Sequence, residues 1–278
     1  MIRRARPWLG TIVEIACDDL PAIEAGFAAI AHVHARLSFH EATSDLAALR
    51  DATPGSVVAV DAQTVQVLRF ALELYRASDG LFDVTIGRQL VATKFLPRVS
   101  ALALSRYNGN AAEIEIVNDT HVICHRPMLI DLGGIAKGHA VDMAVVAMQA
   151  AGATQAIVNA GGDLRVFGPD AETIWLRRAD GQLGGSLDAR NIAVASSSNL
   201  LYRRTSRGAD HSPHIGLAGK AMLTDQTITV TAPSCISADA MTKVAMADTA
   251  LAERLLDPVG GEVIASAQRH VDAVTVIV

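Results

Sequence analysis

The chain has 278 residues, of which 50% are hydrophobic but only 4% aromatic, so its core must be built from Ala, Val, Leu and Ile. This length allows one large domain or two small ones with a sizeable core. The net charge of −5 and the scattered arginines provide no basic face for nucleic acid, and no apolar run reaches the roughly 20 residues that cross a bilayer.

Hydrophobic periodicity predicts a mixture of helices and strands. In chain order the predicted elements are a strand over 8–17, amphipathic helices over 21–38 and 62–78, a β-hairpin over 113–125, strands over 155–160, 164–168, 173–177, 191–196 and 227–232, and a helix from Ser237 to about Met246. The hairpin is expected to turn at Asn118 and Asp119, and Ser237 to cap the last helix.

The order of these elements predicts the fold class. Strands mostly follow one another instead of alternating with helices, which favours an α+β fold with mixed, largely antiparallel sheets and packed helices. No low-complexity linker divides the chain. We therefore expect a single domain over residues 1–278, with two intertwined α+β subdomains as the alternative. Because motifs come from both halves, the active site is expected between them.

A glycine-rich turn follows the apolar, β-prone run 128–130. It contains Gly133 and Gly134, and Lys137 stands at the start of the amphipathic helix that follows. A glycine turn that opens a helix leaves backbone N–H groups unpaired at the positive end of the helix dipole, and the lysine adds a mobile cation. This chemistry suits a diphosphate; a purely structural corner is the alternative. The glycine spacing matches neither a Rossmann fingerprint nor a P-loop.

Cysteine usage and the N-terminus bear on the compartment. Cys17, Cys124 and Cys235 are far apart, odd in number and without a C-x-x-C pair, so we expect buried small hydrophobes in a reducing compartment. Residues 1–7 are rich in arginine, but no apolar h-region or lipobox cysteine follows them. We therefore expect a cytoplasmic protein; a periplasmic location is the alternative if a leader has been removed.

Residues 131–142 (D-L-G-G-I-A-K-G-H-A-V-D) resemble the hallmark segment of the FAD:protein FMN transferases, the ApbE family. Five further segments resemble family motifs in the same order: 9–11 (L-G-T), 38–46 (S-F-H-E-A-T-S-D-L), 80–87 (G-L-F-D-V-T-I-G), 158–165 (V-N-A-G-G-D-L-R) and 237–243 (S-A-D-A-M-T-K). The resemblance covers nearly the whole chain. It implies an Mg²⁺-dependent enzyme that transfers FMN from FAD to a Ser or Thr hydroxyl of an acceptor protein and releases AMP.

The resemblance also implies which residues bind FAD. They are Gly10, His40, Asp83, Asp131, Gly133, Gly134, Ala136, Lys137, Asn159, Gly161, Gly162 and Asp163. His40 stands where the family often has a tyrosine that packs on the flavin. From the residues alone, 159–163 is also typical of a hairpin turn with glycine at positive φ. Asp83 and Thr85 are better suited to fixing their own loop than to contacting the cofactor.

A magnesium site is expected around Asp239. Mg²⁺ prefers a carboxylate, a few neutral oxygens and substrate phosphate, and it stabilises the charge that develops when a diphosphate is cleaved. Asp239 and Thr242 lie on one face of a helical turn, although a cap or dipole partner is the alternative role for Asp239. The resemblance implies Asp239, Thr242 and the Ala136 carbonyl as ligands. Many relatives carry the threonine one position later, where this chain has Lys243.

The expected catalytic residues are His214 and Asp239. Residues 210–219 (D-H-S-P-H-I-G-L-A-G) stand where the family has H-H-I-I-D-P-x-T-G; the H-I pair is kept but D-P-x-T-G is not. A neutral histidine can accept the proton of a threonine hydroxyl, whereas a loop histidine without a role is the alternative. The departure leaves open hydrolysis of FAD to FMN and AMP, or FAD binding without catalysis.

Overall fold

The computed structural model describes residues 1–100, 102–206 and 208–265, which fold into two compact units. The first unit comprises Met1–His32, Lys137–Arg203 and the chain from Leu223 onward; the second comprises Val33–Ala136 and Arg204–Met222. Both units contain helices and strands, and the sheets are antiparallel throughout the described residues, which confirms the predicted α+β class.

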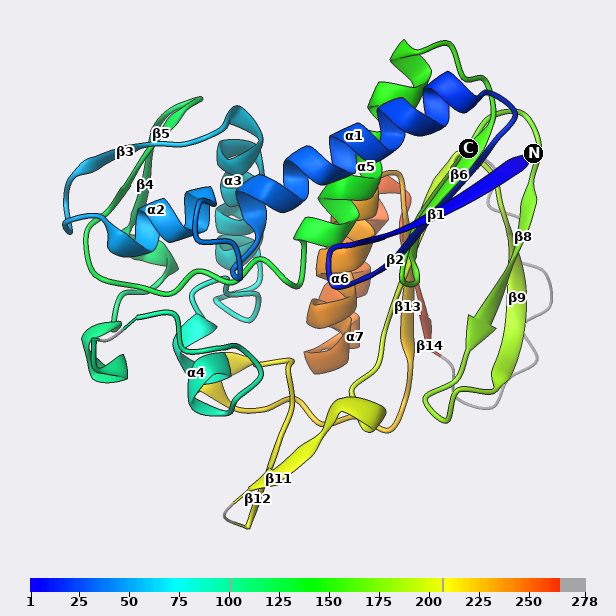
Figure 1. Ribbon diagram of the computed structural model, residues 1–278. Helices are drawn as coiled ribbons and strands as arrows, with labels where there is room; N and C mark the ends of the chain where they lie inside the picture. The colour runs from blue at the N-terminus through cyan, green and yellow to red at the C-terminus, as the bar shows by residue number, and fades with distance from the viewer. Residues whose placement is uncertain (101, 207, 266–278) are drawn as a thin grey trace. The chain divides into compact units, whose positions relative to one another are not determined.

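A seven-stranded sheet forms the centre of the first unit (Figure 1). Its strands, in spatial order, are β1 (Ile2–Trp8), β2 (Thr11–Cys17), β6 (Ala156–Ala160), β7 (Asp163–Phe167), β10 (Ile192–Ser197), β13 (Ile228–Ala232) and β14 (Glu262–Ala265). The strand predicted over 8–17 is wrong at its start, because Leu9 and Gly10 both adopt positive φ and form the turn between β1 and β2.

Both faces of this sheet are covered, which explains why the central strands are almost continuously apolar. Helices α5 (Ala136–Ala150), α6 (Cys235–Ala247) and α7 (Thr249–Leu256) lie on one face (Figure 1). The hairpin of β8 (Glu172–Arg177) and β9 (Leu183–Ala189) covers the other, where its buried side chains join those of β6, β7 and β10 in one core. Helix α1 (Leu20–Leu37) begins in the first unit and ends in the second.

The second unit combines short helices with a three-stranded sheet in the order β3-β5-β4. Its elements are α2 (Asp45–Asp51), β3 (Val57–Ala59), α3 (Ala62–Ala77), α4 (Gly87–Ala92), β4 (Ile114–Asn118), β5 (His121–Cys124), β11 (Arg204–Ser206) and β12 (Ala209–His211). The buried Asp45 carboxylate accepts hydrogen bonds from Asp61 N at 2.7 Å and Thr64 Oγ1 at 2.6 Å. These bonds tie the start of α2 to the start of α3.

Several sequence predictions are confirmed. Helices α1 and α3 and the β4–β5 hairpin lie within one or two residues of the predicted ranges, because each has a clear apolar face. All three cysteines are free and buried, as expected. Among the described residues, no helix is both long and apolar enough to cross a membrane.

The start of α6 differs from the prediction. The helix begins at Cys235, two residues before Ser237, and its N-cap residue Ser234 makes no capping bond through its side chain. The elements that the sequence analysis did not predict are β1, β3, β9, β11, β12, β14, α2, α4 and α7. All but α7 are seven residues long or less, too short for hydrophobic periodicity to stand out.

Candidate active site

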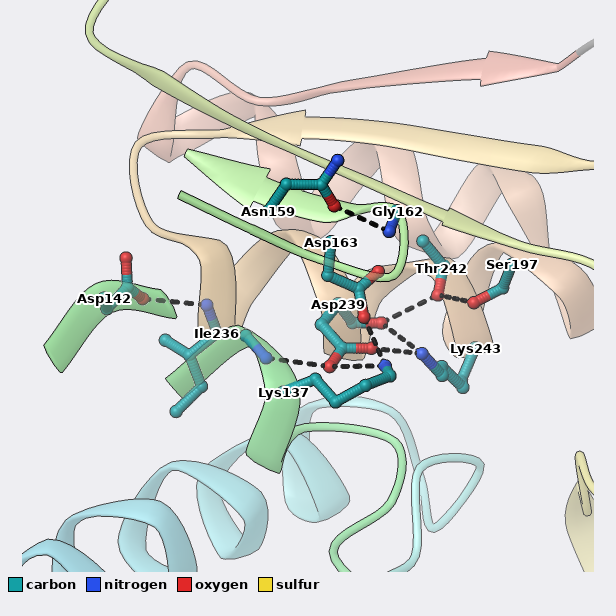
Figure 2. A network of polar contacts seen from close by, with 11 residues as sticks. Lys137, Asp142, Asn159, Gly162, Asp163, Ser197, Ile236, Asp239, Thr242 and Lys243 are labelled. Atoms are coloured by element: carbon teal, nitrogen blue, oxygen red, sulfur yellow. Dashed lines mark hydrogen bonds and ion pairs between the residues drawn. The ribbon is translucent and has the colours of Figure 1, made fainter. Parts of the chain in front are cut away.

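Two lysines and two aspartates meet at one end of the first unit's sheet, and we call them the lysine–aspartate cluster: Lys137, Asp163, Asp239 and Lys243 (Figure 2). Lys137 is the second residue of α5 and Asp163 is the first of β7, while Asp239 and Lys243 lie one turn apart on α6. The Lys137 ammonium donates to Asp163 Oδ2 and lies 3.5 Å from Asp239 Oδ2. The Lys243 ammonium donates to Asp239 Oδ1 and, at 3.0 Å, to the Asp239 carbonyl.

Gly138 allows α5 to approach α6 closely enough to form this cluster. A Cβ at this position would lie 2.2 Å from the Cys235 carbonyl oxygen and 2.9 Å from Asp239 Cβ. The Gly138 N–H belongs to the first turn of α5, where it has no partner within the helix, and it donates to Asp239 Oδ2 at 3.1 Å. The sequence shows Gly138 only as part of a motif. In the structure, the absence of a side chain at Gly138 lets α5 and α6 pack closely.

Asp142 caps α6 from the neighbouring helix α5. Its Oδ2 accepts the backbone N–H of Ile236 at 2.9 Å (Figure 2), and its Oδ1 accepts that of Cys235 at 2.9 Å. Arg165 Nη1 in turn donates to Asp142 Oδ1 at 2.7 Å. This capping aligns α6 with α5, although the residues are more than 90 positions apart in the sequence. No local pattern could have revealed it, because N-capping is recognised from residues next to the helix.

The electrostatics of the cluster depend on burial and on the balance of charge. Asp239 is completely buried, and burial alone favours its neutral form, but Lys137, Lys243 and the Gly138 N–H outweigh burial and lower the pKa of Asp239. Burial and the charge of Asp239 raise the pKa of Asp163. Burial opposes the charge of Lys137, yet the two carboxylates raise its pKa. Two ammonium groups therefore face two buried carboxylates, while the Lys137 and Lys243 side chains remain 27% and 12% exposed.

The predicted glycine turn at 159–163 is a hairpin turn that delivers Asp163 to the cluster. Gly161 and Gly162 connect β6 to β7 with φ of +68° and +104°, as expected for glycine in such a turn. Asn159 Oδ1 accepts the Gly162 N–H at 2.9 Å. A Cβ on Gly161 would lie 2.4 Å from Thr11 Oγ1, so this turn lies beside the turn that contains Gly10.

Two predicted motifs of the second unit fold against each other. The Asp131 N–H donates to the Val84 carbonyl at 2.8 Å, and the Gly87 N–H donates to the Leu129 carbonyl at 3.1 Å. The Asp83 carboxylate accepts both the N–H and the hydroxyl of Thr85 at 2.7 Å, so it fixes its own loop. The segments 80–87 and 128–131 therefore form one structural region.

The remaining predicted residues also belong to the second unit. His40 is exposed and makes an edge contact with the buried Phe39 ring, at 6.2 Å between centroids. The half-buried His214 donates its N–H to Ser212 Oγ at 3.1 Å, and its carbonyl accepts the Met222 N–H at 2.8 Å. Neither Gly133 nor Gly134 adopts positive φ. Their turn leads into Ala136, the first residue of α5.

The residues around Asp239 do not fit the expected magnesium site. Its Oδ1 accepts from Lys243, and its Oδ2 accepts from Gly138 and faces Lys137. The Thr242 hydroxyl donates to the Asp239 carbonyl at 2.7 Å and also bonds the Ser197 hydroxyl at 2.7 Å. No three His, Cys, Asp or Glu side chains in the described ranges are grouped so that they could hold a metal ion. The carboxylate on which a cation would depend is thus already paired with ammonium groups.

The fold and this buried site were compared with known proteins. The model of the ApbE family matches residues 9–263. A FAD:protein FMN transferase of Rhodobacter capsulatus is 28% identical over 181 residues, which are 60% of this chain and 35% of that protein. One of Vibrio cholerae is 24% identical over 228 residues, 75% of this chain and 68% of that protein. The crystal structure of the ApbE protein from Thermotoga maritima has a TM-score of 0.82 at 22% identity, covering 95% of this chain and 93% of that one.

The likeness to the Thermotoga maritima structure, at 22% identity, shows that this chain has the α+β fold of that ApbE protein. The family model covers nearly all of the chain, so the chain belongs to the ApbE family. The chain spans about a third of the length of the Rhodobacter capsulatus relative and about two thirds of the Vibrio cholerae one.

Gly138→Ala is expected to lower the stability of the protein by about 1 to 3 kcal/mol, the usual cost of an added methyl group in a packed core. The new methyl would collide with the Cys235 carbonyl and separate α5 from α6. Urea unfolding measures the effect. Gly133→Ala is the matched control, because its methyl would meet the Asp131 carboxylate at 3.2 Å, and this side chain can move. Equal stabilities of the two variants would contradict the packing role of Gly138.

Proposed function

We propose that this chain transfers FMN from FAD to a Ser or Thr hydroxyl of an acceptor protein and releases AMP. Membership of the ApbE family supports the proposal, as do the names of two curated relatives, both FAD:protein FMN transferases. The observation that carries it is the lysine–aspartate cluster at the N-terminus of α5, where the ammonium groups of Lys137 and Lys243 suit an anion such as a diphosphate.

The reaction breaks one bond of the diphosphate and forms one phosphoester bond. The acceptor hydroxyl oxygen attacks the phosphorus on the FMN side, the bond from that phosphorus to the bridging oxygen breaks, and AMP leaves with the bridging oxygen. Negative charge grows on the leaving group, where the Lys137 ammonium at the N-terminus of α5 can stabilise it. Nothing is oxidised or reduced.

The hydroxyl proton needs an acceptor, and we assign this function to His214. A neutral imidazole accepts a proton readily near neutral pH. Two hydrogen bonds hold the backbone on either side of this residue, and the Ile215–Ala221 bridge closes the loop behind it. These contacts fix the backbone that carries the imidazole ring.

Two sets of residues are proposed to contact FAD, and each is described within its own unit. In the first unit, the adjacent turns that contain Gly10 and Gly161 offer backbone without side chains, and Asp163 follows them. In the second unit, the region of Asp83 and Asp131 contributes, with His40 beside the flavin. A divalent cation is not part of the proposed mechanism, because the donors around Asp239 are occupied by Lys243, Lys137 and Gly138.

The proposed activity is tested by incubating the protein with FAD and a protein extract. The extract is made from source cells that lack the gene for this protein, so that its acceptor is unmodified. Transfer predicts AMP release only when the extract is present, together with a flavin-fluorescent protein band whose modified peptide carries FMN on Ser or Thr. AMP and free FMN without extract would instead show hydrolysis. FAD binding without release of AMP would show a protein that binds FAD without catalysis, the alternative that the missing D-P-x-T-G segment leaves open.

A further inference from the structure

Lys243 is a largely buried lysine beside the completely buried Asp239 carboxylate. Its side chain is only 12% exposed, and lysine is rarely buried unless it is paired. The ammonium donates to Asp239 Oδ1 and to the Asp239 carbonyl, both within the same turn of α6. An ammonium group has three N–H donors, and the third has no protein partner among the described residues.

The same ammonium occupies the place that a metal ion would need. A cation bound by Asp239 must reach one of its two carboxylate oxygens, but Oδ1 faces Lys243, and Oδ2 faces Lys137 and the Gly138 N–H. The Thr242 hydroxyl, the expected neutral ligand on the helix, is buried and bonded to Ser197 and to the Asp239 carbonyl. A divalent ion would therefore have to displace an ammonium group from the Asp239 carboxylate.

We propose that Lys243 supplies the cation of this site and that its third N–H donor binds the diphosphate of FAD, so that the chain binds FAD without a divalent metal. This inference rests on the proposed function, because it takes FAD as the ligand. Asp239 holds Lys243 in place, and because Asp163 and Asp239 balance the charges of the two lysines, the diphosphate is bound by charge-assisted N–H donors and not by a net positive charge.

Metal binding is tested directly, without FAD, by electron paramagnetic resonance of added Mn²⁺. The wild-type protein is expected to leave the signal of free Mn²⁺ unchanged. Lys243→Thr removes the ammonium and leaves the Asp239 carboxylate open beside a hydroxyl, so this variant is expected to bind Mn²⁺. Mn²⁺ binding by the wild-type protein at micromolar concentration would overturn the inference, whatever the variant does.

FAD affinity provides the second measurement, by quenching of flavin fluorescence in EDTA and again in millimolar Mg²⁺. We expect equal affinities for the wild-type protein. Lys243→Met should weaken binding about tenfold or more in EDTA, the loss typical of one charge-assisted hydrogen bond. Lys243→Arg should retain most of the affinity. Lys94→Met removes an exposed lysine of the second unit and serves as the matched control.

The outcomes separate the inference from the proposed function. FAD binding that strengthens tenfold or more with Mg²⁺ would contradict the inference alone. So would a folded Lys243→Met variant, checked by circular dichroism, with unchanged affinity, because Lys243 would then only neutralise Asp239. Absence of FAD binding in both conditions would contradict the proposed function, and the Mn²⁺ experiment would still decide whether the site accepts a metal.

Discussion

Asp239→Asn is expected to reduce FMN transfer by roughly 10²–10³-fold, the loss that follows removal of one preorganised electrostatic group. The amide keeps the shape of the side chain but loses the charge that holds both Lys137 and Lys243. FAD binding should remain measurable, because both ammonium groups are still present, although they are no longer held in one geometry. Single-turnover transfer rates and FAD titrations measure the two effects separately.

The same variant should also be less stable by about 3 to 5 kcal/mol, because removal of one member of a buried ion pair leaves its partner uncompensated. Urea unfolding measures this loss. In the double variant Asp239→Asn with Lys243→Met, both charges of the pair are gone, and stability should recover relative to Asp239→Asn alone. If Asp239→Asn is as stable as the wild-type protein, the ion pair does not stabilise the fold. If this variant transfers FMN at the normal rate, Asp239 has no part in the reaction.

His214→Ala is expected to slow FMN transfer by roughly 10²–10⁴-fold, as is typical for loss of a general base. FAD affinity should hardly change, because a base acts on the acceptor hydroxyl and not on the diphosphate. The transfer rate is measured at saturating FAD, and the affinity by flavin fluorescence.

His211→Ala is the control for this prediction, since His211 is the last residue of β12 and precedes His214 by three positions. It should transfer FMN at nearly the wild-type rate. If His211→Ala is the damaging change and His214→Ala is silent, the base has been assigned to the wrong histidine. Normal transfer by both variants would mean that another group accepts the proton.

The long elements of the fold could be predicted from the sequence because their periodicity is local. Helices α1 and α3 each present apolar residues at helical spacing, and the β4–β5 hairpin combines alternation with a polar turn. The start of α6 could not be predicted in this way. Its first N–H groups are capped by Asp142 of α5, so the capping signal lies outside the helix and its flanking residues.

The sequence by itself determined the family and the chemistry of single residues: a lysine at a glycine-rich helix start, an aspartate on a later helix and a pair of glycine turns. Only the tertiary structure decided how these groups are used. It brings Lys137, Asp163 and Asp239 together from three elements, and it reveals Gly138 as the contact that permits this approach. It also places Lys243 on Asp239, where the sequence predicted a metal. The physical reason is that charge pairing and close packing depend on distances in space, which residue spacing along the chain does not specify.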